Sequence, residues 1–456
     1  MRLGRFLFSL VPTAILAYAA EPWSQFRGPN STGVAASSGY PVEFGPKKNM
    51  LWRAPVRPGK SSPVLTERHI FLTAHDNGKL FTLCFDRPSG KLLWERSIDR
   101  ARHDKVHALN EPASASPVTD GDNVYVFFRD FGLVSYDSRG HLRWKTPLGP
   151  FADPEGASSS PIIAGGHLIL VSNQSYDGYI AAFDLANGET RWKTARQETA
   201  GWGTPVVVEG QIVAAGTGQM SGYHPRTGQL AWQQQGLAPA LVATPAVDAS
   251  RLYIFGYGLE EPRPWHTTLA RFDKNNDGKI GSDEFQDNTL LIRTGTQLGD
   301  RDGFITKDEW EASMRRVTKP SSLVALDLTG GKQPRELWRY ERSFMGVVPS
   351  PLILNGVVYF VKNGAIFTAM DAATGQVAKT ARLPGAAGNY YASLVADPAG
   401  FIYAASEKGE VSVIKAGKEW DVIRTNDLGE EIHATPALSG GRIFLRTNEA
   451  LYCFRP

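Results

Sequence analysis

The sequence predicts an all-β protein, an eight-bladed β-propeller with a small α-helical insert. Three observations point to this fold: the composition, two short phrases that alternate along the chain, and one interval between copies that is much longer than the others and so indicates an insert. Of 456 residues, 46 are Gly, 29 are Pro and 11 are Trp, whereas only 21% are charged. This composition argues against a disordered chain, a coiled coil or a helical bundle, and it favours many short strands joined by tight turns.

The first repeated phrase consists of a small residue, Asp, a turn that contains Gly, and then Trp. In one copy, Ala182-Phe183-Asp184 is followed by Gly188 and Trp192. Other copies begin at Cys84, Ser135, Gly222 and Ala325, the copy at Ala369 has Lys379 in place of Trp, and the copy at Ser412 runs to Trp420. We expect Gly to adopt backbone angles that other residues avoid, and Trp to bury its ring between neighbouring blades.

The second phrase is Ser or Thr followed by Pro and aliphatic residues. It occurs at Pro63, Pro117, Pro161, Pro205, Pro245, Pro351 and Pro436, and Ser393-Leu394 holds the place of a copy that has lost its Pro. Successive copies are 54, 44, 44, 40, 106, 43 and 42 residues apart. A period of about 40–45 residues with four strands per unit is typical of a β-propeller, so eight copies predict eight blades.

The two ends of the chain predict how the ring closes. The segment 451–454 begins a copy of the first phrase but stops before its Trp strand, whereas Leu51-Trp52-Arg53 is a Trp strand with no phrase before it. We therefore expect the N-terminal strand to complete the last blade. Cys84 and Cys453 occupy equivalent small-residue positions on adjacent blades, which are too far apart for a disulfide, so two buried free thiols are expected.

The first 20 residues have the pattern of a Sec-type signal peptide. Arg2 and Arg5 precede an apolar stretch from Phe6 to Leu16, and small residues follow, so cleavage is expected after Ala19 or Ala20. We expect a monomeric periplasmic or secreted protein, since no other apolar run is long enough to cross a membrane. The formal net charge of +3 gives no reason to expect a nucleic-acid partner.

The long interval contains a segment with the spacing of an EF-hand calcium loop. Asp273, Asn275 and Asp277 stand at loop positions 1, 3 and 5, and Glu284 stands at position 12. Lys279 would contribute its carbonyl oxygen at position 7, and Gly278 permits the sharp turn at position 6. The sequence therefore predicts a calcium site in the insert.

A second, weaker loop follows from Leu298 to Glu309, with Asp300 and Asp302 at positions 3 and 5. Its first position is Leu298, which has no side-chain oxygen, so we expect weak or absent calcium binding. Ile280 and Ile305 are expected to pair between the loops, over a small core of Phe272, Phe285 and Trp310. The second loop begins only 25 residues after the first, which predicts a shortened connecting helix.

Exported calcium modules commonly bind at about 10⁻⁴–10⁻³ M, where the ion is constantly bound. We therefore interpret the first loop as a structural site and not as a calcium sensor.

The loops that lead from each outer strand to the next inner strand should converge on one face of the ring, around the central channel. They would present aromatic, acidic and imidazole side chains to a small ligand or a glycan. The candidates are His103, His107, Asn110, Glu111, Asp153, Glu155, Trp202, Phe344, Asn389, Tyr390, Glu431 and His433. A loop is a better interpretation of His103 and His107 than a metal-binding helix, because Pro112 follows them closely.

The phrase from Ala182 to Trp192 resembles the repeat of pyrroloquinoline-quinone (PQQ)-type propellers. That family includes the quinoprotein alcohol dehydrogenases and the propeller subunit of outer-membrane protein assembly. The segments 23–30, 103–107 and 113–121 look like a branch of exported bacterial PQQ-repeat proteins, and the resemblance extends from Trp23 to the C-terminus. The dehydrogenases usually carry two adjacent cysteines beside the quinone, so the separated Cys84 and Cys453 count against a redox site.

The sequence predicts four parts: a signal peptide (1–20), a first propeller part (21–261, with the closing strand and blades 1–5), the EF-hand insert (262–320), and a second propeller part (321–456, blades 5–8). The leading hypothesis is a non-catalytic binding module for a protein or polysaccharide partner, with Ca²⁺ as its cofactor. One alternative is an alcohol or sugar dehydrogenase that holds PQQ in the channel. Another is an assembly factor for outer-membrane proteins. No phosphate loop, nucleophile elbow or zinc-ligand cluster supports a hydrolase.

Overall fold

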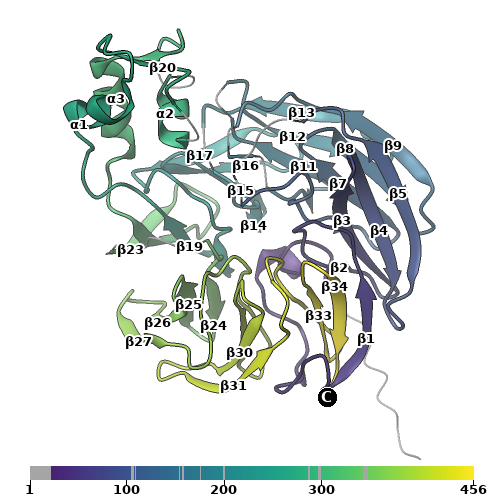
Figure 1. Ribbon diagram of the computed structural model, residues 1–456. Coiled ribbons are helices and arrows are strands. Elements are labelled where there is room, and N and C mark those ends of the chain that lie inside the picture. Colours follow the sequence, from purple (N-terminus) through teal and green to yellow (C-terminus); the bar gives the residue numbers. More distant parts are fainter. Residues whose placement is uncertain are drawn as a thin grey trace, which may run out of the picture.

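The structure is a computed structural model that describes residues 22–103, 107, 109–153, 155–156, 159–174, 176–198, 201–285, 288–295, 299–342 and 348–456. Within these residues, the strands form eight four-stranded sheets and one two-stranded sheet. The eight larger sheets stand around one axis like the blades of a propeller (Figure 1). The predicted eight-bladed β-propeller is confirmed.

Each blade is an antiparallel meander that runs from the channel outward. Blade 1 consists of β2 (Val64–Leu65), β3 (His69–Asp76), β4 (Lys79–Asp86) and β5 (Leu92–Asp99). Blades 2 to 4 consist of β6 (Val118–Thr119), β7 (Asn123–Phe128), β8 (Gly132–Asp137) and β9 (Leu142–Pro147); β10 (Ile162–Ala164), β11 (His167–Ser172), β12 (Tyr179–Asp184) and β13 (Thr190–Ala195); and β14 (Val206–Val208), β15 (Gln211–Gly216), β16 (Gln219–Tyr223) and β17 (Leu230–Gln235).

Blades 5 to 7 repeat this order. They consist of β18 (Ala246–Asp248), β19 (Arg251–Gly256), β22 (Ser322–Asp327) and β23 (Arg335–Glu341); β24 (Leu352–Leu354), β25 (Val357–Lys362), β26 (Ile366–Asp371) and β27 (Val377–Arg382); and β28 (Val395–Ala396), β29 (Phe401–Ala405), β30 (Glu410–Lys415) and β31 (Asp421–Asp427). The two middle strands of each blade are buried on both faces because blades pack on either side, which explains their nearly continuous apolar sequences.

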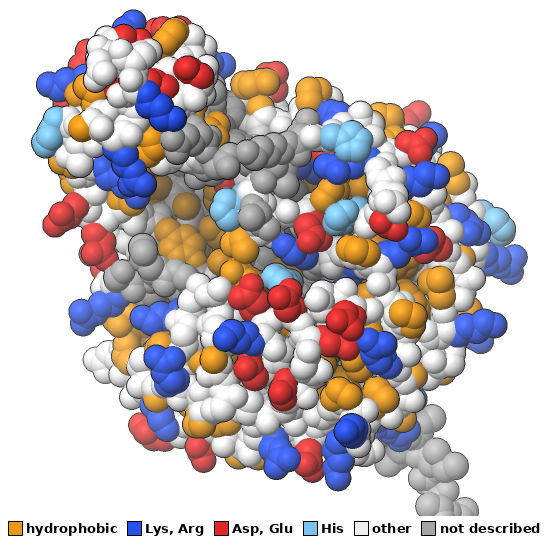
Figure 2. All heavy atoms as spheres, viewed as in Figure 1, with side chains coloured by type: hydrophobic (Ala, Val, Ile, Leu, Met, Phe, Trp, Pro, Cys, Tyr) orange, Lys and Arg blue, Asp and Glu red, His pale blue; other side chains and the backbone are white. Residues whose placement is uncertain are grey.

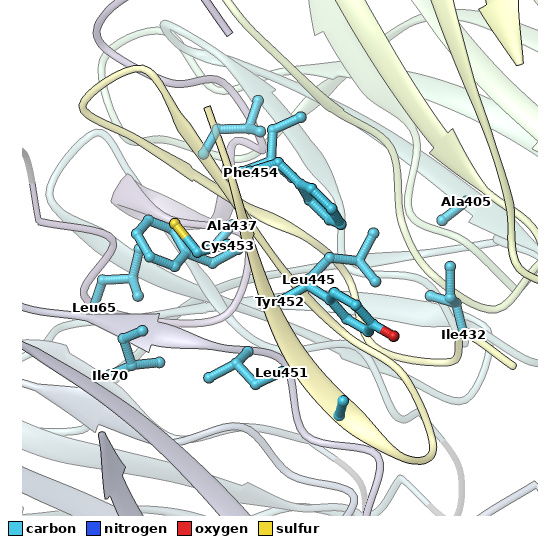
Figure 3. Close-up of a cluster of buried hydrophobic side chains, with 14 of the residues drawn as sticks. Leu65, Ile70, Ala405, Ile432, Ala437, Leu445, Leu451, Tyr452, Cys453 and Phe454 are labelled. Carbon is cyan, nitrogen blue, oxygen red and sulfur yellow. The ribbon is translucent and has the colours of Figure 1, made fainter. Parts of the chain in front are cut away.

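Blade 8 joins the two ends of the chain. Strand β1 (Met50–Pro55) pairs with β34 (Ala450–Phe454), next to β33 (Arg442–Arg446) and β32 (Ala437–Ser439). Trp52 lies opposite Cys453 in this pairing. In Figure 3, Leu65 of blade 1 belongs to the same buried cluster as Cys453 of blade 8. The predicted closure is confirmed: β1 is the outer strand of blade 8 and pairs with the edge of β34 that would otherwise be exposed.

At five of the junctions between the described blades, the repeated Trp holds one blade to the next. The Trp94 indole donates to the Ser138 carbonyl of blade 2 at 2.9 Å, and its ring covers Gly140 of the same turn. Trp52, Trp144, Trp192 and Trp338 cover the turn glycines of their following blades in the same way. One predicted position was wrong: Trp420 precedes β31, and Arg424 pairs with Val413 where most of the other blades place Trp.

A closed belt of hydrogen bonds surrounds the channel. It is formed by the Ser or Thr of the second phrase in each blade, and we name these eight residues the hydroxyl belt: Ser62, Ser116, Ser160, Thr204, Thr244, Ser350, Ser393 and Thr435. Each backbone N–H donates to the hydroxyl oxygen of the next blade, at 2.9–3.2 Å, and Thr435 closes the circle onto Ser62 at 3.0 Å. The belt therefore fixes the spacing of all eight inner strands.

The segment before β1 closes one end of the channel, and we name residues 22–35 the base segment. Trp23 pairs with Leu65 of blade 1, Asn30 bonds both backbone groups of Val207 in blade 4, and Val34 pairs with Ala396 in blade 7. These partners lie at the far ends of the inner strands from the hydroxyl belt. The base segment therefore crosses the channel on the face opposite the belt.

The insert lies between β19 and β22 of blade 5, and stands at one corner of the ring (Figure 1). It contains α1 (Trp265–Phe272), β20 (Ile280–Gly281), α2 (Thr289–Arg293), β21 (Phe304–Ile305) and α3 (Lys307–Val317). Ile280 pairs with Ile305, and Phe272, Phe285 and Trp310 share one buried cluster, as predicted. The connecting helix α2 is short, with five residues.

No helix within the described ranges is both long enough and apolar enough to cross a membrane.

The contact between turn glycines and tryptophans predicts a measurable cost of one methyl group. A Cβ added at Gly140 (φ +83°) would lie 2.7 Å from the Trp94 ring, whereas one added at Gly166 (φ +82°) would meet nothing within 4 Å. We expect Gly166→Ala to lower the free energy of unfolding by about 1 kcal/mol, the cost of the left-handed backbone alone.

Gly140→Ala should cost about 3 kcal/mol, because the indole must also move. Denaturant unfolding of both variants measures the difference. Equal losses for the two variants would show that the Trp94 contact contributes nothing.

Candidate functional site

A cavity of about 390 Å³ opens on the belt face of the propeller and extends down to the base segment. Phe26 of the base segment lies at its floor, and the eight hydroxyls of the belt line its wall. Figure 2 shows this face hollowed at the centre, with histidine and acidic side chains along the edge of the hollow. The cavity is therefore open at one end, and its mouth lies on the face where loops were predicted to converge.

In seven of the blades, a second set of side chains lines the mouth, two residues before the belt residue; the corresponding position of blade 3 lies outside the described residues. We name this set the upper tier: Lys60, Ser114, Trp202, Val242, Val348, Tyr391 and His433. Successive residues of an extended chain point to opposite sides, so residues two apart face the same way. The positions of the belt residues therefore determine which residues form the upper tier. The upper tier places three aromatic or imidazole rings and two valines at the mouth.

This register decides which of two adjacent tyrosines can reach a ligand. Tyr390 was predicted to face the channel, but it is fully buried in the cluster shared by blades 6 and 7. Tyr391, two residues before Ser393, lines the cavity instead. The Tyr391 ring stacks on the His433 ring with centroids 5.2 Å apart and planes within 4°.

Blades 1 and 8 bring a group of charged side chains to one side of the mouth. Glu111 contacts His75 at 3.3 Å and Lys60 at 3.5 Å. Burial opposes ionisation of Glu111, but the His75 hydrogen bond and the Lys60 charge outweigh it and lower the pKa of this carboxyl. For His433, burial and the nearby Lys60 both lower the pKa, so its ring is neutral at pH 7.

The insert reaches the opposite side of the mouth through one arginine. Arg293 of α2 donates to Glu155 of the loop between blades 2 and 3 through both Nε (3.2 Å) and a terminal nitrogen (2.5 Å). Its guanidinium also lies over the Trp202 ring, 5.0 Å from the centroid. The Trp202 indole donates to the buried Asp153 carboxylate at 3.1 Å. The helical insert is thus tied directly to the wall of the cavity.

The other predicted face residues have separate positions. His107 and Asn110 line the cavity, and Asn110 donates to the Glu155 carbonyl at 2.6 Å. Glu431 and Glu111 line an adjoining hollow, Asn389 bonds Glu407, and His103 is exposed outside both cavities. Phe344 lies outside the described residues.

The first loop of the insert has the hydrogen bonds of a preformed turn. Gly278 (φ +83°) donates to Asp273 at 3.0 Å, and Lys279 donates to Asp277 at 2.9 Å. Glu284 accepts from Lys274 at 2.6 Å and from Gly281 at 2.9 Å, and these backbone bonds lower the pKa of its carboxyl. The ionised carboxylate of Glu284 is therefore held between the two ends of the loop.

These residues offer hard oxygen donors of the kind that calcium prefers. In the described part of the chain, however, no three His, Cys, Asp or Glu side chains converge as they would around a bound metal ion. The loop therefore fits calcium by the type and order of its donors. Closure of the acidic side chains on the ion would have to accompany binding.

The second loop holds its last residue in the same way. Glu309 accepts from the Asp300 backbone at 3.0 Å and from the Thr306 backbone at 2.9 Å, where it completes the N-terminal cap of α3. Asp302 accepts from the Phe304 backbone at 2.8 Å. The first loop position, Leu298, lies outside the described residues.

Both cysteines are free and fully buried, as predicted. Cys84 lies opposite Trp94 and Cys453 opposite Trp52, within the blade packing and away from the cavity. Burial raises the pKa of the Cys453 thiol to about 12 and also raises that of Cys84, so neither is a nucleophile.

Residues 81–259 and 266–455 match the sequence family described as outer membrane protein assembly factor BamB (PQQ_2). The match is interrupted only at the start of the insert. A search of curated proteins finds no match.

Solved structures with the same fold come from two functional groups. One is BamB from Moraxella catarrhalis, at 14% identity and a TM-score of 0.56, covering 89% of this chain and 98% of that one. A europium-containing methanol dehydrogenase has 10% identity and a TM-score of 0.58, with 93% and 89% covered. The quinohemoprotein alcohol dehydrogenase from Comamonas testosteroni has 11% identity and a TM-score of 0.56, with 95% and 80% covered. At these identities the likeness establishes the fold alone.

The surroundings of Asp153 predict a pH-dependent stability. Burial, together with the neighbouring Glu155 charge, raises the pKa of Asp153 to about 7, although the Arg293 charge opposes this. Because this pKa is higher in the folded than in the unfolded chain, stability is fully present below pH 4 and is lost as the pH rises through 7.

Asp153→Asn keeps a neutral group at this position at every pH. We expect the variant and the wild type to melt at similar temperatures at pH 4, and the variant to melt several degrees higher at pH 8. Calorimetry at the two pH values measures this. If the difference in melting temperature between variant and wild type were the same at both pH values, the raised pKa of Asp153 would be contradicted.

Proposed function

The chain belongs to the family described as outer membrane protein assembly factor BamB, and from that premise we propose that it is an exported, non-catalytic binding module. A protein or polymer partner docks on the belt face, around the mouth of the cavity. Calcium in the first loop of the insert stabilises the protein. The proposal includes cleavage after Ala19 or Ala20, which mass spectrometry of the N-terminus of the mature protein would test.

The observation that carries this proposal is the construction of the mouth. Its charged side chains are already paired with one another: Glu111 with His75 and Lys60, and Glu155 with Arg293. Such pairs place charges rigidly for recognition. Asp153 has a pKa of about 7, which would suit a catalytic acid or base, but it is buried, is bonded to Trp202 and does not line the cavity, so it has no room for a substrate proton beside it.

Calcium belongs to the proposal because the insert is attached to this same mouth. The first loop lies between α1 and α2, and α2 carries Arg293, which contacts Glu155 and Trp202. An ion that orders the loop would therefore also hold α2 against the cavity wall. Asp273, Asn275, Asp277, Lys279 and Glu284 would be its ligands, with Asp300, Asp302 and Glu309 as a weaker set.

Glu284→Gln tests the calcium site, because position 12 contributes both oxygens of a carboxylate. We expect the wild type to gain about 2.7 kcal/mol of stability at a calcium concentration 100 times the Kd, and the variant to lose most of this gain. Melting temperatures in CaCl₂ and in EGTA measure it, and calorimetric titration gives the Kd.

Glu311→Gln is the matched control, because Glu311 is an exposed carboxylate on α3 outside both loops. No calcium-dependent change in the wild type would contradict the site. Micromolar affinity with a large conformational change would contradict its structural role and indicate a sensor.

The main alternative is a quinoprotein dehydrogenase with PQQ in the channel. We expect purified protein incubated with PQQ and calcium to retain no quinone absorbance and to show no dye-coupled oxidation of alcohols or sugars. A clear signal in either assay would overturn the non-catalytic proposal. The other alternative, an assembly factor for outer-membrane proteins, predicts co-purification of the native protein with a β-barrel assembly complex.

A further inference from the structure

We propose that the cavity is a saccharide-binding site, in which the uncharged end of a glycan enters the channel and is bound by the hydroxyl belt. The proposal deepens the proposed function, since it rests on a binding role for the belt face and names the chemistry of the ligand. Four features of the cavity support it: unpaired hydroxyl donors, apolar surfaces, the absence of free charge in the described wall, and a closed base.

The first feature is the state of the eight belt hydroxyls. Each oxygen accepts one backbone N–H from the neighbouring blade, and each of these residues is at most 4% exposed. Among the described residues, none of the eight hydroxyls donates to a protein acceptor. A buried hydroxyl without an acceptor is costly, so eight converging O–H donors require oxygen acceptors inside the cavity.

Water alone could supply these acceptors, but water would not explain the second feature, which is the apolar surface of the cavity. Phe26 closes the floor, and Trp202, Val242, Val348 and Tyr391 present apolar or aromatic surface around the mouth. A sugar ring combines an apolar C–H face with oxygen acceptors around its edge. The cavity offers both complements, and its 390 Å³ is within the size range of about 300–1,000 Å³ of small-molecule sites.

The third feature decides against an anion. Among the described residues that line the cavity, the acidic and basic side chains are Lys60 and Glu155. Each already has a counter-ion, Glu111 for Lys60 and Arg293 for Glu155. Burial lowers the pKa of His433, which keeps that ring uncharged near pH 7. Arg27 of the base segment has two buried nitrogens without a hydrogen-bond partner, but it is fully buried and does not line the cavity. A buried anion would therefore find no free cation among the described lining residues, whereas a neutral saccharide needs none.

The fourth feature fixes the direction of entry. The base segment spans the far end of the channel through Leu65, Val207 and Ala396, so a ligand enters past the upper tier. A polymer cannot thread through the channel, and the site must bind a chain end or a short oligosaccharide.

The test is direct binding of defined probes to the full mature protein. Maltose, cellobiose and chitobiose are titrated up to 10 mM with saturation-transfer NMR and calorimetry as readouts, and citrate and inorganic phosphate serve as anionic comparison probes. We expect at least one disaccharide to bind and the two anions not to bind.

Two matched pairs of variants locate the site. Thr244→Val removes one belt hydroxyl and Thr244→Ser keeps it, so only the valine variant should weaken disaccharide binding, by about tenfold. Val242→Trp fills the mouth and should abolish binding, whereas Val377→Trp adds the same side chain at an exposed position on the outer strand β27, outside the cavity lining, and should leave binding unchanged. Melting temperatures accompany each variant, and if Thr244→Val does not fold, the pair of Trp variants, which leaves the belt intact, carries the test.

Three results would overturn the proposal: no binding of any disaccharide to the wild type, binding of citrate or phosphate in place of sugar, or disaccharide binding that Val242→Trp leaves unchanged. None of these results affects the calcium titration of Glu284→Gln or the PQQ and dye-coupled oxidation assays. Failure of the saccharide site is therefore distinguishable from failure of the proposed function.

Discussion

The hydroxyl belt is the constraint on which the rest of the molecule depends. A propeller is stable only when each blade is held by both neighbours, and here each inner strand donates one N–H to a hydroxyl of the next, eight times around the channel. Each bond contributes about 0.5–1.5 kcal/mol net, and breaking one would leave a buried amide without a partner. The belt is closed, so no blade can shift outward without breaking two of these bonds.

The belt also determines the chemistry of the cavity. Using each hydroxyl oxygen as an acceptor leaves its proton directed to a group outside the belt, and the alternation of an extended chain places the upper tier directly above. The loops beyond the upper tier can therefore vary in length without moving the wall. Blade 5 has the longest addition, because its β19–β22 hairpin contains the whole insert. The insert contacts the cavity wall through Arg293, which bonds Glu155.

Much of the fold could be predicted because repeats reveal a ring before any strand is located. Ser393-Leu394 is the most informative copy: the phrase lost its Pro there, and yet the structure places Ser393 in the belt like its seven counterparts. The hydroxyl, and not the Pro, is the part of the phrase that the ring requires. From the sequence alone, the phrase reveals only the period of the repeat, because a hydrogen bond between neighbouring blades produces no recognisable pattern within a single repeat.

The site could be predicted only in part for related reasons. Trp202 and His433 could be predicted because loops around a channel commonly form a binding site. The prediction of Tyr390 was wrong because the cavity-facing position lies two residues before Ser393, where Tyr391 stands. Counting two residues back from each belt position would have identified Lys60 and Tyr391. Nothing in the sequence indicates that Arg293 of the insert reaches Glu155, since that contact depends on how the insert is oriented on blade 5.

The central claim, that eight inter-blade bonds close one continuous belt, is tested most directly by hydrogen exchange at the belt amides. The account predicts that all eight exchange only through global unfolding, with free energies within about 1 kcal/mol of one another. Thr435 is decisive, because its N–H bonds Ser62 across the junction of the two chain ends. Rapid exchange at Thr435 through local opening, while the other seven stay protected, would contradict a closed belt.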